Sequence, residues 1–264
     1  MTHVALAQFA PGDDKAANLA LITRLAGDAA DRGARVVVLP EYAMFTVPAM
    51  DRRFVDSAED LDGEFVTGLL ALAANRGVTV VGGMNERLDG SRISNTLVAA
   101  GPDGAVAALY RKIHLYDAFG FRESAVVRAG EITEPETFEV DGVRFGLQTC
   151  YDLRFPEVTR RLADAGAQVV LLPAEWVPGP LKEYHWSTLV RARAIENTVY
   201  VAAAGQAAPT GSGTSMLVDP MGVVVTSLGE QTGVAVGEVS AERISEVRAK
   251  NPALELRRFT VVPR

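Results

Sequence analysis

The chain has 264 residues, 48% of them hydrophobic, and a net charge of -7. A chain of this size can bury a sizeable core, and its acidic balance argues against a general nucleic-acid binder and against docking on anionic lipid. The single cysteine excludes an intrachain disulfide and a zinc site built from several thiolates, and the three histidines are too scattered to predict a metal site.

The N-terminal segment and the hydropathy pattern indicate where the protein works. The segment MTHVALAQFAPGDD lacks the basic and apolar regions of a signal peptide. No apolar stretch approaches the ~20 residues that a membrane-spanning helix needs. We therefore expect a cytoplasmic protein that has no nucleic-acid or membrane partner.

Short apolar runs rich in β-branched residues alternate with segments of helical periodicity. Strands are expected at residues 4–9, 35–41, 78–84, 143–150, 168–173 and 198–206. Helices are expected at 15–33, 65–77, 155–166 and 186–197, and hairpins at 95–112 and 215–228 that turn at GPDG and DPMG. This order predicts an α/β fold with mixed sheets. No Pro/Gly/Ser-rich linker divides the chain, so residues 1–264 are expected to form a single domain.

The chain contains a weak internal repeat. Residues 24–42, RLAGDAADRGARVVVLPEY, resemble residues 161–176, RLADAGAQVVLLPAEW. Two such halves would form two sheets that pack face to face, although any helix–turn–strand unit would look similar. The copies differ after the shared proline, because Glu41 follows Pro40 whereas Ala174 follows Pro173.

Three residues with reactive side chains stand at or just past the ends of expected strands. These are Glu41, Lys112 and Cys150. Because the thiol of a cysteine has an ordinary pKa near ~8.5, it needs a base or a positive field to react at neutral pH. A desolvated carboxylate is a suitable base, and an ammonium can stabilise a thiolate or an oxyanion. Each residue taken alone also fits a plain role: a small buried hydrophobe, a solvated acid and a surface cation.

Three sequence blocks, which occur in this order along the chain, favour catalytic roles for these residues over the plain ones: LPEY, YRKIHLYDAFGFRES and CYDLRFPE. They resemble the signature blocks of the nitrilase superfamily, the carbon–nitrogen hydrolases, and the similarity runs from VALAQF to LRRF. The resemblance implies a four-layer αββα sandwich of two mixed β-sheets. It also implies a homodimer or higher homo-oligomer, a small-molecule amide substrate, and no metal or organic cofactor.

The Glu-Lys-Cys triad of that family falls on Glu41, Lys112 and Cys150. The resemblance implies that Glu41 accepts the proton of Cys150, that the thiolate forms a thioester with the substrate, and that the backbone N–H of Tyr151 helps Lys112 to hold the oxyanion. Glu123 resembles an additional family glutamate that orients Lys112 or the substrate. A solvent-exposed Glu123 is the alternative.

Within the superfamily the blocks look most like the ω-amidase and deaminated-glutathione amidase branch, whose small amides carry a carboxylate. The segment AEWVPGPLKEYHW departs from those relatives, which usually have a small-residue and Phe-containing segment ending in GPAHW. Glu175 and Trp176 then fall at the expected pocket wall, together with Tyr116 and Phe119, and Glu175 would disfavour a dicarboxylic substrate. A core or interface role is equally open for the three aromatic residues.

Several alternatives stay open. The same triad would serve an N-carbamoyl amide hydrolase or a nitrilase, although nitrilases commonly have Cys-Trp-Glu where this chain has Cys-Tyr-Asp. A catalytically idle binding or scaffold subunit and a redox-sensing thiol are the non-hydrolase readings. Arg154 is expected to form an ion-paired turn with Asp152 and Glu157, or to contact substrate. Arg191 and Arg193 would bind a substrate carboxylate or form internal or interface pairs.

Overall fold

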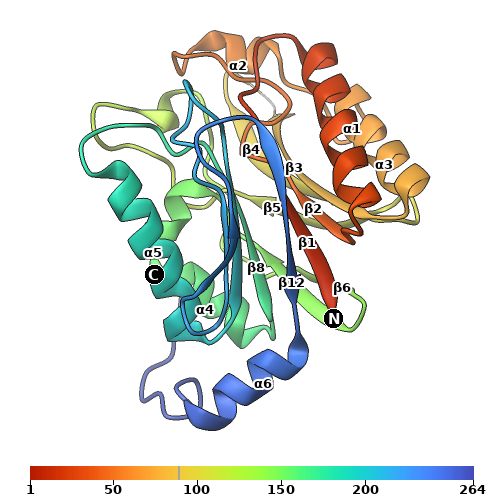
Figure 1. Cartoon of the computed structure of the whole chain (residues 1–264). Coiled ribbons are helices and arrows are strands. Elements are labelled where there is room, and N and C mark those ends of the chain that lie inside the picture. The colour runs from red at the N-terminus through yellow and green to blue at the C-terminus, as the bar shows by residue number, and fades with distance from the viewer. Residues whose placement is uncertain (89) are drawn as a thin grey trace.

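Two β-sheets lie face to face between two pairs of helices (Figure 1). The computed structural model describes residues 1–88 and 90–264. The first sheet has the strand order β12-β1-β2-β3-β4-β5. Its strands are β1 (Thr2–Gln8), β2 (Val36–Val38), β3 (Thr79–Arg87), β4 (Ile93–Ala100), β5 (Val106–Arg111) and β12 (Gly233–Val239).

The second sheet repeats the pairing pattern of the first. Its strands are, in spatial order, β6 (Thr137–Val140), β7 (Val143–Leu147), β8 (Val169–Ala174), β9 (Tyr200–Gly205), β10 (Met216–Val218) and β11 (Val224–Ser227). From β12 to β5, and again from β6 to β11, the pairs are antiparallel, parallel, parallel, antiparallel and antiparallel. The internal repeat is therefore structural, with β2 and β8 as equivalent strands, and both predicted hairpins are confirmed.

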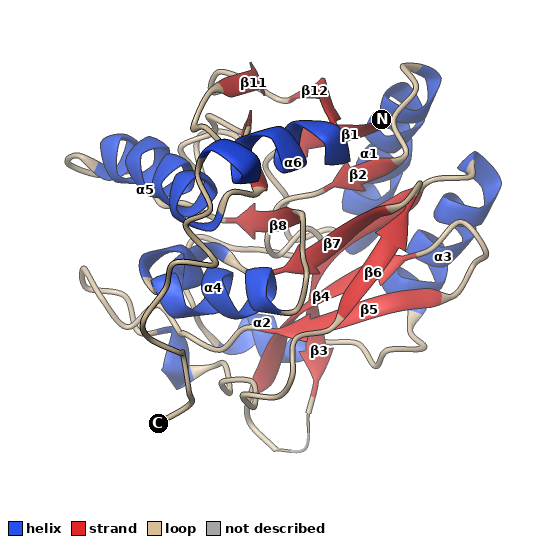
Figure 2. Cartoon of the chain, turned by 90° about the horizontal axis from the view of Figure 1, so that it is seen from below, coloured by secondary structure: helices blue, strands red, loops and turns tan. Residues whose placement is uncertain are grey.

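The helices are α1 (Lys15–Asp31), α2 (Arg52–Asp56), α3 (Glu64–Arg76), α4 (Pro156–Asp164), α5 (Lys182–Asn197) and α6 (Ala241–Lys250), with short 3-10 turns η1 (Glu123–Ala125) and η2 (Cys150–Arg154). The four predicted helices are present as α1, α3, α4 and α5, and the structure adds α2 and α6, which the sequence pattern did not predict. Figure 2 shows α1 and α3 on one side of the strands and α4 and α5 on the other. Among the described residues, no helix combines the length and apolar character needed to span a membrane.

Alternation of side chains along the central strands produces the four layers. Val36 and Val38 face the second sheet, whereas Val37 packs under α1 and α3. The equivalent strand β8 alternates in the same way, with Val169 and Leu171 facing the first sheet. Because successive strand residues point to opposite faces, each sheet has one apolar face for its partner sheet and one for its helices. The structure thus confirms the predicted αββα sandwich of two mixed sheets.

Strand direction explains why distant residues meet at one end of the sandwich. Strand β5 runs in the same direction as β2, because two antiparallel pairings separate β5 from β3 and β3 is parallel to β2. In the second sheet, β7 and β8 are parallel. Glu41 and Lys112 therefore follow strands of the first sheet at the same edge, and Cys150 and Glu175 follow strands of the second.

Candidate active site

The turn that carries Cys150 is held by a buried aspartate. Cys150 has φ 44°, a left-handed conformation that a cysteine keeps only when its surroundings impose it. Asp152 accepts hydrogen bonds from the backbone N–H of Thr149 at 3.1 Å, the hydroxyl of Tyr110 at 2.7 Å and the backbone N–H of His114 at 3.1 Å. These contacts fix the turn that carries Cys150 to β5 and to the segment that follows it.

A buried lysine lies between two buried carboxylates. Lys112 Nζ is 2.8 Å from Glu41 Oε1 and 2.9 Å from Glu123 Oε2, and the three side chains are 2%, 1% and 3% exposed. Asn95 Nδ2 donates to Glu41 Oε1 at 2.7 Å and to Glu123 Oε1 at 3.1 Å. Charges at this depth persist only when they are paired and hydrogen-bonded. The solvent-exposed alternative for Glu123 does not describe this structure.

Further contacts fix the Glu123 carboxylate, and close packing fixes the backbone that carries Glu41. The Tyr42 hydroxyl donates to Glu123 Oε1 and the backbone N–H of Tyr116 to Glu123 Oε2, each at 2.6 Å. Strand β3 passes so close that a Cβ on Gly83 would lie 2.6 Å from the backbone nitrogen of Tyr42. Only glycine therefore fits beside the Glu41–Tyr42 segment without displacing it.

The electrostatics define the resting protonation state. Burial raises the pKa of the Cys150 thiol well above its ordinary value, with Glu41 adding to this effect and Lys112 opposing it. Burial opposes the charge on Lys112, but Glu123 and Glu41 together outweigh it and raise the pKa of Lys112. Burial likewise opposes ionisation of Glu123, yet Lys112 and the hydrogen bonds lower its pKa. The resting site therefore holds the thiol of Cys150, the ammonium of Lys112 and the carboxylate of Glu123.

A small cavity of about 40 Å³ joins Glu41, Lys112 and Cys150. Glu175 and Tyr116 also line it, and the other lining residues are Tyr42, Val47, Pro48, Met50, Phe54, Phe121, Glu123 and Val177. The walls are thus mostly apolar around one polar corner, as is typical of ligand sites.

Two of the four residues expected at the pocket wall lie outside this lining. Phe119 is 64% exposed. Trp176 is only 2% exposed, because its indole packs at 5.3 Å from that of Trp186 and its N–H donates to the carbonyl of Lys182. Tyr116 and Glu175 are the two that line the cavity.

The two rings instead support a pair of cations beside the cavity. The Arg154 guanidinium lies 4.9 Å from the Trp176 ring and 5.5 Å from that of Phe119. Lys182 Nζ lies 4.9 Å from each of the same rings and 2.9 Å from the Tyr116 hydroxyl. Lys182 is 5% exposed, and in the part of the chain that the structure describes neither cation forms an ion pair. Burial, with a contribution from Arg154, lowers the pKa of Lys182.

Two hypotheses about arginines can be compared with these contacts. Arg154 pairs with neither Asp152 nor Glu157 among the described residues, so the expected ion-paired turn is replaced by the hydrogen bonds of Asp152. Arg191 donates to the carbonyl of Gly222 and Arg193 to that of Leu153, which are internal contacts.

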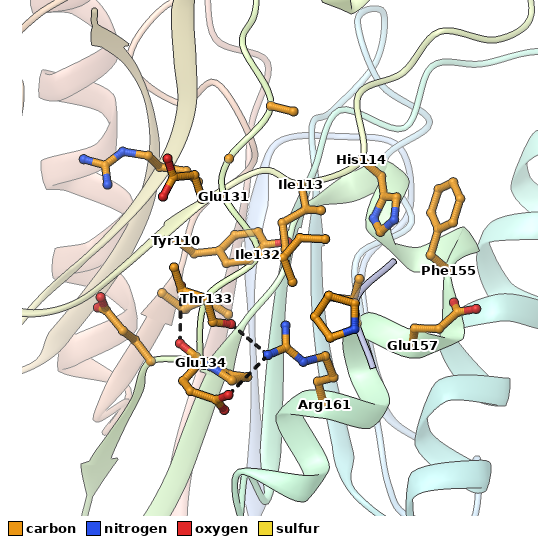
Figure 3. Close-up of a pocket in the computed structure, with 18 of the residues that line it drawn as sticks. Tyr110, Ile113, His114, Glu131, Ile132, Thr133, Glu134, Phe155, Glu157 and Arg161 are labelled. Atoms are coloured by element: carbon orange, nitrogen blue, oxygen red, sulfur yellow. Dashed lines mark hydrogen bonds and ion pairs between the residues drawn. The ribbon is translucent and has the colours of Figure 1, made fainter. Parts of the chain in front are cut away.

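A second cavity, of about 1110 Å³, is lined by residues of β5, of the segment 128–136 and of α4 (Figure 3). Figure 3 shows Arg161 directed at Thr133 and Glu134, and the backbone carbonyl of Thr133 accepts from Arg161 at 2.9 Å. The cavity is lined by Tyr110 and His114, the residues that hold Asp152, but by none of the triad. Its size therefore does not make it the catalytic cavity.

Comparison with known proteins agrees with this fold. The family model described as carbon–nitrogen hydrolase matches residues 3–249. Deaminated glutathione amidase of Escherichia coli O157:H7 is 40% identical, with 97% of each chain covered. The omega-amidase of Mus musculus is 33% identical, over 97% of this chain and 95% of the relative.

Solved structures show the same architecture. A CN-hydrolase superfamily protein from Xanthomonas campestris, with an arsenic adduct in its active site, superposes with a TM-score of 0.85 at 30% identity, covering 99% of each chain. An amidase from Nesterenkonia sp. AN1, carrying acrylamide by Michael addition at its active-site cysteine, superposes at 0.79 with 28% identity, covering 97% of this chain and 100% of that one. The chain belongs to the carbon–nitrogen hydrolase family and is an enzyme of that class.

Sequence reasoning missed two residues of the site. Asn95 lies within β4, where no motif distinguishes it from its neighbours. Lys182 lies in the segment that departs from the family pattern, and only the three-dimensional structure shows that no acidic side chain within the described ranges pairs with it.

Proposed function

We propose that the protein hydrolyses the C–N bond of a small amide that also carries a carboxylate, through a thioester on Cys150. The observation that carries this proposal is the meeting of Glu41, Lys112 and Cys150 in one buried cavity. They come from both sheets, yet no other grouping in the described chain joins a thiol, a base and a cation in this way. The amidase names of the two curated relatives support the same reaction.

The first half-reaction needs the thiol to lose its proton only as it attacks. Because burial keeps Cys150 protonated at rest, Glu41 accepts the thiol proton while the sulfur bonds to the amide carbon. Lys112 Nζ lies within hydrogen-bond distance of Glu41 Oε1 and of both carboxylate oxygens of Glu123; when one N–H is shared between the two oxygens of Glu123, the third N–H is available to the oxyanion. The backbone N–H of Tyr151 lies in the first turn of η2, where N–H groups have no intrahelical acceptor, and supplies the second donor.

The remaining steps return the site to its starting state. To complete the first half-reaction, the tetrahedral intermediate collapses, the C–N bond breaks, and Glu41 gives its proton to the leaving nitrogen, which departs as ammonia or an amine. In the second half-reaction, water gives a proton to Glu41 and attacks the thioester. The C–S bond breaks, the acyl group leaves as a carboxylic acid, and Cys150 regains its proton from Glu41.

The substrate carboxylate is assigned to the paired cations Arg154 and Lys182. Both contact the same two aromatic rings, and both lack a carboxylate partner among the described residues. A largely buried lysine without a counter-ion is costly, and an anionic ligand removes that cost. Negative charge on the Cys150 sulfur favours the charged form of Lys182, which supports a position of Lys182 near the reacting sulfur.

The test is ammonia release from a panel of amides by the wild-type protein, Cys150→Ala and Lys182→Met. The panel contains α-ketoglutaramate, α-ketosuccinamate, succinamate, neutral aliphatic amides and N-carbamoyl amino acids. For deaminated glutathione, release of the amino-acid-containing product is followed. We expect turnover that Cys150→Ala abolishes, and a KM for carboxylated amides that Lys182→Met raises about tenfold, the equivalent of one lost charge-assisted contact.

Control substrates make the result specific. Lys182→Met should leave the KM of neutral amides within about twofold, since a purely structural defect would affect both classes. The proposal fails if no amide is turned over in a Cys150-dependent manner. Preferential turnover of N-carbamoyl amino acids would move the assignment to carbamoyl hydrolysis.

Assembly and location are separate proposals. We propose a homodimer or higher homo-oligomer, because α5 exposes the apolar side chains of Tyr184 and Ile195 and the C-terminal segment exposes Phe259. Sedimentation of the purified protein as a monomer at micromolar concentration would contradict it. The cytoplasmic location remains a prediction from the sequence.

A further inference from the structure

Glu175 is anchored beside the reacting groups by its own main chain. It follows β8, the strand equivalent to β2 that precedes Glu41. Its backbone N–H donates to Glu41 Oε2 at 2.7 Å, and its carbonyl accepts from the Cys150 thiol at 3.5 Å. The first atoms of its side chain are therefore fixed next to both the base and the nucleophile, Glu175 is one of the residues that line their cavity, and its carboxyl group is close enough to Glu41 and Lys112 to be affected by their charges.

The carboxyl group of Glu175 has hydrogen-bonding capacity that the rest of the cavity does not use. The carboxylates of Glu41 and Glu123 are each satisfied by three or more donors from neighbouring elements. Among the described residues, Glu175 receives one long contact, from the Thr46 hydroxyl at 3.4 Å. A polar group in an apolar-walled cavity with few partners is the group that a ligand satisfies.

Its surroundings set its charge. Glu41, Glu123 and the Cys150 thiol face it, and the nearby cation, Lys112, already lies between the two carboxylates. Burial, followed by Glu41, raises the pKa of Glu175 to about 8, and Lys112 opposes this only in part. At neutral pH the group is therefore mainly a carboxylic acid, which donates a hydrogen bond, rather than a carboxylate, which only accepts.

We propose that Glu175 is a specificity-determining residue whose carboxyl O–H donates a hydrogen bond to a keto or hydroxyl oxygen on the acyl part of the substrate, close to the scissile amide. The inference rests on the proposed function and names a substrate feature that the function leaves open. A cavity of about 40 Å³ admits only a slim acyl segment, which brings such an oxygen within reach. The substrate carboxylate is excluded from this position by Glu41 and Glu123, and it is held outside by Arg154 and Lys182.

The preference for an acyl acceptor oxygen should depend on pH. Above pH 8 the Glu175 proton is lost, so the donor disappears and a third negative charge faces Glu41 and Glu123. The preference for an acyl acceptor oxygen must then decline, whereas a glutamine at this position keeps an N–H donor at every pH.

The experiment compares kcat/KM for α-ketosuccinamate and succinamate, which differ by one keto oxygen. Wild type, Glu175→Gln and Glu175→Ala are measured at pH 7 and pH 9. We expect wild type to prefer the keto amide about tenfold at pH 7, equal to about 1.4 kcal/mol, and to lose most of that preference at pH 9. Glu175→Gln should keep the preference at both pH values, and Glu175→Ala should show none at either.

Each contrary result is distinguishable. An unchanged substrate ratio in Glu175→Ala, or no preference in wild type at pH 7, overturns the role of Glu175 while leaving amide hydrolysis intact. If no amide is turned over, the proposed function fails instead. The unfolding midpoint and the rate of Cys150 alkylation report whether a variant is intact. If Glu175→Ala does not fold, a loss of preference at pH 9 in Glu175→Gln that matches wild type overturns the inference.

Discussion

Replacing Lys112 by methionine tests whether the buried cation holds the two carboxylates together. The change removes a charge that lies 2.8 Å from Glu41 and 2.9 Å from Glu123, at side-chain exposures of 1–3%. Leaving buried charges without their partner costs about 3–5 kcal/mol of unfolding free energy. The loss of an oxyanion donor should lower kcat by about 10²–10³-fold as well.

The pH dependence of that loss follows from the signs of the pKa shifts. In wild type the pKa of Glu123 is lowered by folding, so the stability it contributes is present above the unfolded pKa and lost as pH falls. In Lys112→Met the cation that lowers the pKa of Glu123 is gone while burial remains, which raises the folded pKa of Glu123 above the unfolded value. The contribution of Glu123 is then greatest at low pH and is lost as pH rises. The stability gap between variant and wild type should therefore narrow from pH 7.5 to pH 5.5.

Urea unfolding measures the loss of unfolding free energy and its change with pH. Tryptophan fluorescence follows the transition, because Trp176 and Trp186 are buried. Lys250→Met, an exposed change at the end of α6, is the matched control and should stay within about 0.5 kcal/mol of wild type. A second control, Glu123→Gln combined with Lys112→Met, should recover part of the lost stability. A loss below 1 kcal/mol at pH 7.5, or a gap that widens on acidification, would refute the reasoning.

Three further changes test the surroundings of the triad. Gly83→Ala should lower kcat at least tenfold (about 1.4 kcal/mol), since the new Cβ would meet the Tyr42 backbone. In the control Gly82→Ala the new Cβ meets only leucine and phenylalanine side chains, so most activity should remain. Equal kinetics in the two variants would contradict this reasoning. Tyr42→Phe removes a buried donor to Glu123 and should cost about 1.5–3 kcal/mol of unfolding free energy in urea titrations, so an unchanged midpoint would exclude a structural role for that bond. Asn95→Ala should reduce kcat about tenfold or more with KM within about twofold, in steady-state assays; a pure KM effect would place Asn95 in substrate binding instead.

Most strands, most helices and the pairing of two similar halves could be predicted, because short sequence patterns encode them. The run Val36–Val38 shows the continuous apolar character of a strand buried on both faces, and the repeated helix–turn–strand unit indicates two equivalent sheets. The helix that precedes β9 begins at Lys182 rather than near Trp186, because residues 182–185 have no breaker and the last proline before them is Pro180.

The site could be predicted only where a motif names a residue. Glu41, Lys112 and Cys150 stand in recognisable blocks, but Asn95 reaches Glu41 across 54 positions and Lys182 reaches Tyr116 across 66. No local pattern encodes such contacts, because they join residues that are distant in sequence and meet only when the strands and helices assemble. Packing of α5 against the second sheet buries Trp176 beside Trp186, although its position just past a strand end suited a wall residue equally well.

The pairing of β12 with β1 has a consequence for synthesis on the ribosome. β1 emerges well before its antiparallel partner, which runs from Gly233 opposite Gln8 to Val239 opposite Thr2 and emerges more than 200 residues later. At about 5–20 residues per second, this edge of the first sheet lacks its neighbour for roughly 10–50 s. An unpaired edge strand is a template for association with other chains. The nascent protein is therefore most exposed to aggregation while it is being made, and a chain that stops before residue 233 never closes that edge.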